Sequence, residues 1–203
     1  MEQDKKTRIR KKLNELKKYR CRYLIAVIEN PRDIKNIGTV IRNVNALGVG
    51  KVYIVDPRKG LPNSWQKMKE ECLLLGASVS AINWSFVKRF DNTQDCLDHL
   101  KKRGYTSIVT SPHLKGNKNV ILHEGDYTPY TKLAVWFGNE SKGISDIAVK
   151  NSVLCVNLPM FGMVESLNLG TSSGIVLYEI TKQRREYQRK YKHKKKRGRK
   201  YIA

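Results

Sequence analysis

Residues 158–180, LPMFGMVESLNLGTSSGIVLYEI, form the stretch that decides the fold of this chain. An apolar run at 153–156 stops at Leu158-Pro159, and an apolar helical face begins near residue 174. The residues between them mix flexible apolar side chains with small polar ones, whereas a loop that only joins a strand to a helix needs little more than a cap and a glycine. We therefore expect the wall of a ligand pocket at the carboxyl end of a strand, where open α/β sheets bind their ligands.

Two other apolar runs end in polar, glycine-containing segments of similar character. The run at 23–28 leads into residues 29–42, and the run at 133–137 leads into residues 138–145. Because the carboxyl ends of parallel strands lie at one edge of a sheet, these three segments can converge on a single site.

Strand-like and helix-like segments alternate along the chain, which is typical of an α/β protein. This order predicts a mainly parallel sheet with helices on both faces. Predicted strands cover 23–28, 51–55, 84–90, 105–110, 133–137 and 153–158, and predicted helices cover 5–19, 36–47, 67–75, 93–103, 146–150 and 167–189.

The charge of the chain is large and unevenly distributed. Its 203 residues hold 40 Lys and Arg against 18 Asp and Glu, a formal net charge of +22. Residues 1–22 carry +7 and residues 182–203 carry +11, which leaves +4 for the residues between them. We therefore expect a basic N-terminal helix or extension at 1–22, one folded domain at 23–187 and a basic C-terminal tail at 188–203.

These basic ends favour a polyanionic partner. Basic runs are often only solvated tails, but here two of them flank one domain, and Tyr187 and Tyr191 lie within the second. Basic side chains neutralise phosphates and tyrosines stack on bases, so RNA is the favoured partner. An anionic membrane surface is the rival, but residues 182–200 have almost no apolar face for insertion, so we expect no membrane contact.

Several classes of protein lack support in the sequence. No stretch is long and apolar enough to span a bilayer, and the N-terminus has no apolar signal core. The sequence contains neither a P-loop nor a G-x-G-x-x-G motif, and its four histidines lack metal-ligand spacing, so we expect no metal site. Scattered cysteines predict reduced thiols in a cytoplasmic protein: Cys21, Cys72, Cys96 and Cys155.

Three segments together resemble the ordered signature motifs of a known enzyme superfamily. They are Asn36-Ile37-Gly38-Thr39-Val40-Ile41-Arg42, then Phe137-Gly138-Asn139-Glu140-Ser141-Lys142-Gly143, then Leu158-Pro159-Met160 followed by Ser166-Leu167-Asn168. The set resembles the motifs of the SPOUT superfamily of RNA methyltransferases, and most of all its TrmH family of tRNA and rRNA 2′-O-ribose methyltransferases. The resemblance covers roughly residues 22–185 and rests on all three motifs in order, because one alone would be weak.

The resemblance implies more than the residue patterns do by themselves. The fold would contain a deep C-terminal trefoil knot, and the chain would form a homodimer whose active site is completed across the interface. S-adenosylmethionine would be the cofactor. The favoured substrate is tRNA, with guanosine 18 of the D-loop as the target, because residues 162–168 and the helix after them look most like those members of the family. Ribosomal RNA stays open as the target of the same chemistry, and a non-catalytic RNA-binding or assembly factor on this scaffold is the alternative of another class.

The motif match also implies roles for single residues. The predicted catalytic set is Arg42, Asn36, Ser166, Asn168 and Glu140, and the predicted cofactor-binding set is Thr110, Gly138, Leu158, Met160 and Leu167. We expect Arg42 to act as a planar fork that holds the target phosphate and polarises the hydroxyl, since a guanidinium is a poor base. Structural roles stay open beside these: Asn36 and Ser166 could each cap a helix. Glu140 could brace its loop, and Met160 could serve packing alone.

Overall fold

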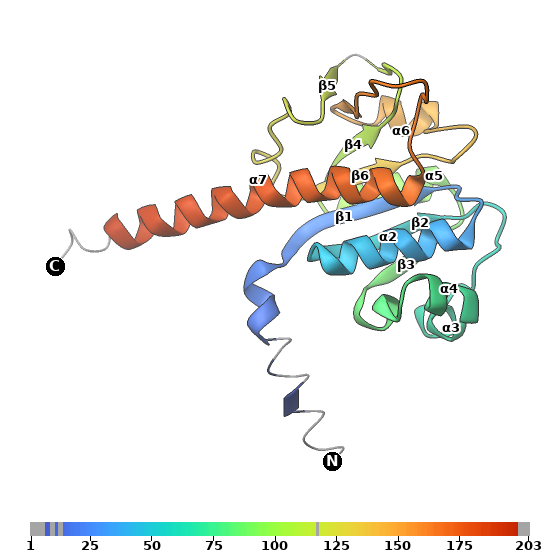
Figure 1. The fold of residues 1–203 in the computed structure, drawn as a ribbon, viewed down its shortest axis with the longest axis horizontal. Coiled ribbons are helices and arrows are strands. Elements are labelled where there is room, and N and C mark those ends of the chain that lie inside the picture. Colours follow the sequence, from blue (N-terminus) through green and yellow to red (C-terminus); the bar gives the residue numbers. More distant parts are fainter. Residues whose placement is uncertain (1–6, 9–10, 12–13, 117, 199–203) are drawn as a thin grey trace.

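The chain is described by a computed structural model that covers residues 7–8, 11, 14–116 and 118–198. Its strands are β1 (Cys21–Glu29), β2 (Val49–Val55), β3 (Val87–Phe90), β4 (Thr106–Thr110), β5 (Asn119–Ile121), β6 (Leu133–Phe137) and β7 (Cys155–Asn157). They form one seven-stranded sheet in the order β3-β2-β1-β6-β4-β7-β5, and every neighbouring pair is parallel (Figure 1). The predicted α/β class with a mainly parallel sheet is therefore confirmed.

Helices cover both faces of this sheet. They are η1 (Lys17–Tyr19), α2 (Ile34–Ala46), α3 (Trp65–Glu70), α4 (Cys72–Ala77), η2 (Ala81–Trp84), α5 (Thr93–Lys102), α6 (Asp146–Lys150) and α7 (Leu169–Gly198). Successive side chains of a strand point to opposite faces, so Ala26 and Ile28 join a core with α2, α4 and α7, while Ile25 and Val27 join a second core with α5 and α6. Burial on both faces explains why the strand segments are continuous apolar runs.

Several predicted segments differ from the structure for local reasons. Glu71 is extended, with φ −68° and ψ 107°, so the single helix predicted at 67–75 is wrong and α3 and α4 replace it. The strand predicted from residue 84 begins only at Val87, because η2 ends at Trp84. β5 is a three-residue edge strand that the sequence does not predict. Of the helix predicted at the N-terminus, residues 7–8, 11 and 14–16 are helical, η1 follows them, and the remainder lies outside the described residues.

Two arginines in the middle of α7 attach this helix to the rest of the fold. Arg184, only 8% exposed, donates hydrogen bonds to carbonyl oxygens at 127–131. Arg185 donates to the carbonyl oxygens of Tyr19 and Leu47, which brings α7 beside the N-terminal segment. Beyond these contacts α7 continues as a helix that projects from the body (Figure 1), nine residues further than the sequence predicts.

Candidate functional site

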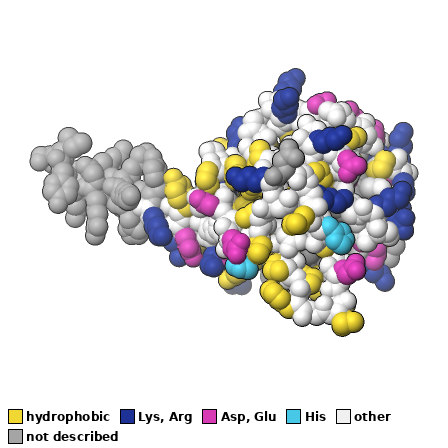
Figure 2. Space-filling model, turned by 90° about the horizontal axis from the view of Figure 1, so that it is seen from above, with side chains coloured by type: hydrophobic (Ala, Val, Ile, Leu, Met, Phe, Trp, Pro, Cys, Tyr) yellow, Lys and Arg dark blue, Asp and Glu magenta, His cyan; other side chains and the backbone are white. Residues whose placement is uncertain are grey.

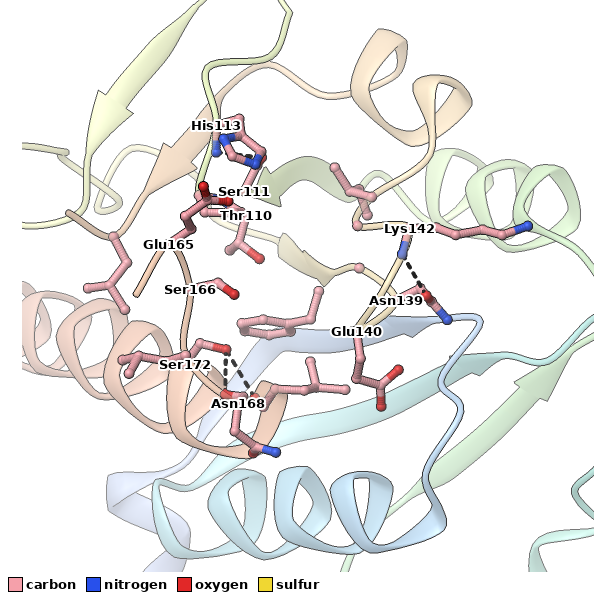
Figure 3. Close-up of a pocket in the computed structure, with 18 of the residues that line it drawn as sticks. Thr110, Ser111, His113, Asn139, Glu140, Lys142, Glu165, Ser166, Asn168 and Ser172 are labelled. Carbon is pink, nitrogen blue, oxygen red and sulfur yellow. Dashed lines mark hydrogen bonds between the residues drawn. The ribbon is translucent and has the colours of Figure 1, made fainter. Parts of the chain in front are cut away.

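A cavity of about 540 Å³ lies at the carboxyl ends of β4, β6 and β7 (Figure 3). Its walls come from residues 110–115, residues 137–144 and residues 156–172. Two of the three strand ends that we expect to converge therefore line it directly, and the third, after β1, contributes from behind through hydrogen bonds. All five residues predicted for cofactor binding line this cavity: Thr110, Gly138, Leu158, Met160 and Leu167.

The loop after β6 is a tight turn that requires glycine at its first position. A Cβ atom on Gly138 would lie 2.3 Å from the carbonyl carbon of Gly143 and from the nitrogen of Ile144. Backbone hydrogen bonds of 2.9 Å run in both directions between Asn139 and Gly143. Gly143 has φ +68°, a conformation that glycine adopts without steric cost. At Gly138 the cavity wall is therefore bare backbone.

Asn139 holds the same turn against the end of β1, a role that the motifs do not predict. Its Oδ1 accepts hydrogen bonds from the backbone N–H groups of Ser141 and Lys142 at 2.9 and 2.8 Å. Its Nδ2 donates to the carbonyl oxygen of Asn30 at 2.6 Å. Asparagine side chains commonly accept a hydrogen bond from the backbone two residues further on. The position of Asn139, directly after Gly138 at the end of a strand, is the sequence feature that indicates this role.

Three polar side chains from three segments form a continuous hydrogen-bonded chain beside the cavity, which we call the amide relay. Asn168 donates through Nδ2 to Oδ1 of Asn36 at 2.9 Å, and Asn36 donates through Nδ2 to Oε1 of Glu140 at 2.9 Å. Oδ1 of Asn168 accepts from the N–H of Gly170 at 2.7 Å, which fixes the orientation of its amide. Glu140 and Asn168 line the cavity (Figure 3), and Asn36 lies buried behind them. Three of the five predicted catalytic residues thus lie together.

Glu140 is held as a carboxylate. Burial by itself raises its pKa, but hydrogen bonds from Asn36 and from the backbone N–H groups of Glu140, Arg32 and Asp33 outweigh burial, so the pKa lies below its ordinary value. The side chain is therefore ionised at neutral pH and accepts hydrogen bonds only. It joins the loop after β6 to the start of α2, which is the bracing role that the sequence left open.

Two caps that the sequence left open are made by other residues. α2 begins at Ile34, and its N-cap is Asp33 rather than Asn36, since Asp33 accepts from the N–H of Lys35 at 2.8 Å. α7 begins at Leu169, and Asn168 rather than Ser166 accepts from the N–H groups of the first turn. The capping interpretation of Ser166 is therefore wrong, and this side chain lines the cavity instead.

Arg42 is the predicted catalytic residue that lies outside both the cavity wall and the amide relay. It is exposed on α2, six residues from Asn36, which corresponds to about 9 Å along the helix axis. Asn43 beside it donates to the carbonyl oxygen of Gly170 at 2.7 Å, so this part of α2 packs against the start of α7. Within one chain, Arg42 therefore lies at the outer surface next to the α2–α7 contact.

The cavity also contains polar side chains for which the motifs predict no role. They follow β4 or flank the third motif: Ser111, His113, Lys115, Glu165 and Ser172. Ser111 accepts from the backbone N–H of His113 at 3.1 Å, and Lys115 donates to the carbonyl oxygen of Ile144 at 3.2 Å. The Ser-Pro pair directly after a predicted strand was the signal for this wall, because such pairs favour a turn.

Within the residues that the structure describes, no three His, Cys, Asp or Glu side chains are grouped so that they could hold a metal ion. In the same part of the chain, no helix is both long enough and apolar enough to cross a membrane. Cys21, Cys96 and Cys155 are buried and free.

Three loops that close around one cavity at the carboxyl ends of parallel strands, with the amide relay beside it, define a ligand-binding site of an α/β protein. The SpoU rRNA Methylase family matches residues 23–178, and the chain belongs to it. It is therefore an RNA methyltransferase, and the resemblance to the TrmH family is confirmed.

Individual relatives are similar over most of the chain. The tRNA (guanosine(18)-2′-O)-methyltransferase of Aquifex aeolicus is 31% identical over 176 residues, which are 87% of this chain and 77% of that protein. The crystal structure of the A. aeolicus TrmH/SpoU tRNA modifying enzyme has a TM-score of 0.70 at 27% identity, covering 88% of this chain and 85% of that one. The AdoMet-bound rRNA methyltransferase from Sinorhizobium meliloti, at 23% identity and a TM-score of 0.66, covers 78% of this chain and 56% of that one, and it shares the fold.

Proposed function

We propose that this chain transfers the methyl group of S-adenosylmethionine to a ribose 2′-hydroxyl of tRNA, at guanosine 18 in the D-loop. The observation that carries the proposal is the amide relay beside a cavity that the second and third motif segments line and the first supports. The similarity to a protein named for this reaction, over 87% of the chain, supports tRNA as the substrate. The rRNA enzyme shares the fold alone, so ribosomal RNA is the second candidate.

The cavity suits a nucleoside cofactor. Its volume of about 540 Å³ lies within the range of about 300–1,000 Å³ that is common for small-molecule pockets. Backbone groups at Leu158 and Leu167, with Thr110 as a third, would hold the adenine. Gly138 would line the pocket with bare backbone, and Met160 would pack against the cofactor. When bound, S-adenosylmethionine supplies a methyl group on a sulfonium whose positive charge disappears during transfer, so a wall without a ring of carboxylates suits it, and Glu140 and Glu165 are the carboxylates that line this cavity.

The residues of the chain would orient and activate the hydroxyl. A ribose 2′-hydroxyl is a poor nucleophile until its proton leaves, so it must be placed in line and its developing charge stabilised. In our proposal the ionised Glu140 fixes Asn36, Asn36 fixes Asn168, and Asn168 positions the ribose. Arg42 holds the phosphate and polarises the hydroxyl through its planar fork. A guanidinium does not take the proton, which therefore passes to phosphate or water.

A second copy of the chain would bring Arg42 to the reacting groups. The loop after Leu158 exposes large apolar side chains: Phe161 is 95% exposed, Val164 is 61% exposed and Met163 is fully exposed. Soluble monomers rarely expose such patches, and they commonly mark protein interfaces. Figure 2 shows exposed hydrophobic side chains together along one margin of the body, where Lys and Arg are few. A homodimer that covers this surface would complete each cavity with Arg42 of the other copy.

The trefoil knot and a cytoplasmic location belong to the same proposal. β7 lies inside the sheet between β4 and β5, and the chain returns from it as α7 over β1 and α2. This path is compatible with threading of the segment after Val153 through an earlier loop.

The free, buried cysteines support a reducing compartment.

The test is methyl transfer in vitro. Purified protein is incubated with labelled S-adenosylmethionine and an unmodified tRNA transcript, and the modified nucleotide is mapped by mass spectrometry. We expect 2′-O-methylguanosine at position 18. Methylation of ribosomal RNA in place of tRNA would contradict the substrate, and saturable cofactor binding without transfer to any RNA would favour the assembly-factor alternative.

A further inference from the structure

A second hollow lies at the amino-terminal ends of the strands, where β1, β2 and β3 begin, whereas the cavity lies at their carboxyl ends. It has a volume of about 530 Å³, and four of the nine residues that line it are basic while none is acidic. Its basic and aromatic members are Lys17, Arg20, Arg22, Lys51, Trp84 and Phe86. We call this hollow the amino-edge groove, and the proposed methyl transfer makes no use of it.

A bulge in β1 builds one side of the groove. The register with β2 shifts between Cys21 and Ile25, and such irregularities redirect side chains. Here Arg22 and Tyr23 are exposed, Tyr23 by 54%, although the strand around them is buried. Gly50 opposite permits the close approach, since a Cβ atom on it would lie 2.4 Å from the carbonyl oxygen of Arg22.

The other side of the groove presents two aromatic rings. Trp84, the last residue of η2, and Phe86, between η2 and β3, are 49% and 44% exposed. Nζ of Lys51 lies 5.0 Å from the centre of the Phe86 ring, a cation–π contact. Half-exposed rings beside cations are the features on which unpaired bases stack in single-stranded RNA sites.

Positive charge gathers around this groove. Burial lowers the pKa of Lys51, and the nearby cations Arg103 and Lys88 lower it further. Burial also lowers the pKa of His99, and Lys88, Arg103 and Lys51 again add to the effect. Clustered like charges destabilise a compact fold by self-repulsion. A polyanion bound here would relieve that cost, so the cluster points to phosphate.

We propose that the amino-edge groove is a second RNA-contact site, which binds the phosphate backbone and stacks an unpaired base at a point remote from the methylated nucleotide. The inference rests on the proposed tRNA substrate and extends it beyond the target loop. β1 crosses the sheet from this edge to the other in nine residues, about 30 Å at about 3.3 Å per residue. An RNA that touches both sites of one chain must therefore extend over about 30 Å. A lipid surface fits less well, because the rings line a hollow instead of projecting from an apolar helix face.

The experiment measures equilibrium binding of two RNAs, a full-length tRNA transcript and a short stem–loop that contains only the D arm. For Lys51→Ala/Trp84→Ala we expect the Kd of the full-length transcript to rise about tenfold through lost stacking. The log–log salt slope should fall by about 0.7–0.9 for one lost phosphate contact. Affinity for the stem–loop should not change, because we expect the D arm to bind at the cavity and not in the amino-edge groove.

Two further variants serve as controls. Lys51→Arg/Trp84→Phe keeps the charge and a ring and should bind the full-length transcript as the unmodified chain does. Lys67→Ala removes an exposed lysine of α3 outside the groove and should leave the affinity unchanged. If the double alanine variant has a lowered Tm, Arg22→Glu at its exposed position provides the same comparison and should weaken binding of the full-length transcript alone.

Three results would overturn the inference. Equal losses of affinity for both RNAs would contradict a separate site, and an unchanged affinity for the full-length transcript would contradict any contact. Binding to phosphatidylserine vesicles that the double variant loses, with RNA affinity unaffected, would assign the groove to a membrane. Because the assay measures binding, a chain that bound tRNA here but methylated nothing would overturn the proposed function and leave this inference standing.

Discussion

Glu140→Gln tests whether the amide relay positions the catalytic groups. Oε1 of Glu140 accepts from Asn36 at 2.9 Å, and Oε2 accepts from the backbone N–H of Arg32 at 3.1 Å. A glutamine has one oxygen, so one of these donors would face an NH₂ group. Asn36 cannot reverse its amide to adapt, because its Oδ1 already accepts from Asn168, whose own amide is fixed by the N–H of Gly170.

The expected size of the effect follows from that lost hydrogen bond. A hydrogen bond to a charged group contributes about 1.5–3 kcal/mol, and because Glu140 is exposed on one side we take about 1.5 kcal/mol. In a protein of this size that loss lowers Tm by about 3–6 °C. A displaced Asn36 should also lower kcat by up to about 100-fold, since misplacement by about 1 Å can have that effect. Cofactor affinity should hardly change.

The assay combines thermal unfolding with single-turnover methylation of tRNA. Ser141→Ala is the matched control. Ser141 lies beside Glu140 on the same loop, and its Oγ accepts a hydrogen bond from Arg32, so the variant loses one hydrogen bond and leaves the amide relay intact. If Glu140→Gln matched this control in both Tm and kcat, the positioning role of the relay would be refuted.

The pH dependence provides a second readout. The pKa of Glu140 in the folded chain is lower than its ordinary value of 4.5, so its contribution to stability is complete above that value and disappears as the pH falls through the folded pKa. The Tm difference between the unmodified chain and Glu140→Gln should therefore be constant from about pH 8 to about pH 6 and shrink below about pH 4. A difference that grew on acidification would contradict the assigned hydrogen bonds.

Three other changes test the remaining parts of the site. Gly138→Ala should abolish saturable binding of S-adenosylmethionine in calorimetry, because the new Cβ would displace the turn. The unmodified chain should bind the cofactor after chelator treatment, and a need for added divalent ions would contradict a metal-free site. Arg42→Ala should abolish turnover at unchanged cofactor affinity, and Arg42→Lys should fail as well; near-normal turnover of the lysine variant would exclude the fork geometry. Deletion of residues 188–203 removes nine basic side chains, so KM for RNA should rise and the log–log salt slope should flatten by about 0.7 per lost phosphate contact, whereas an unchanged slope would show that the tail makes none.

Elements with strong local signals are predicted from the sequence at their observed bounds. β6 is a run of five buried residues, and α6 follows the cap Ser145, whose Oγ accepts from the N–H of Ala148. β5 is three residues long with no buried side chain, so it carries no alternating pattern. η2 ends at Trp84, within a segment that favours a strand by composition, because aromatic residues are frequent in strands.

The cavity is predictable in outline because parallel strands bring their carboxyl ends to one edge. Its connections depend on contacts between segments far apart in the sequence: the two hydrogen bonds of the amide relay join residues 132 and 104 positions apart. A motif can name Asn36, Asn168 and Glu140, but only packing of α2 against α7 brings them together. The same packing places Arg42 on the outer surface of a single chain.

Two tRNA transcripts that differ by one atom decide whether the methyl group goes to a ribose oxygen. One transcript carries guanosine at position 18 and the other carries 2′-deoxyguanosine there. We expect methyl transfer from labelled S-adenosylmethionine to the first transcript, no transfer to the second, and equal binding of both. Methylation of the deoxy transcript would exclude the 2′-oxygen of nucleotide 18 as the acceptor, because the methyl group would then be on a base or on another nucleotide.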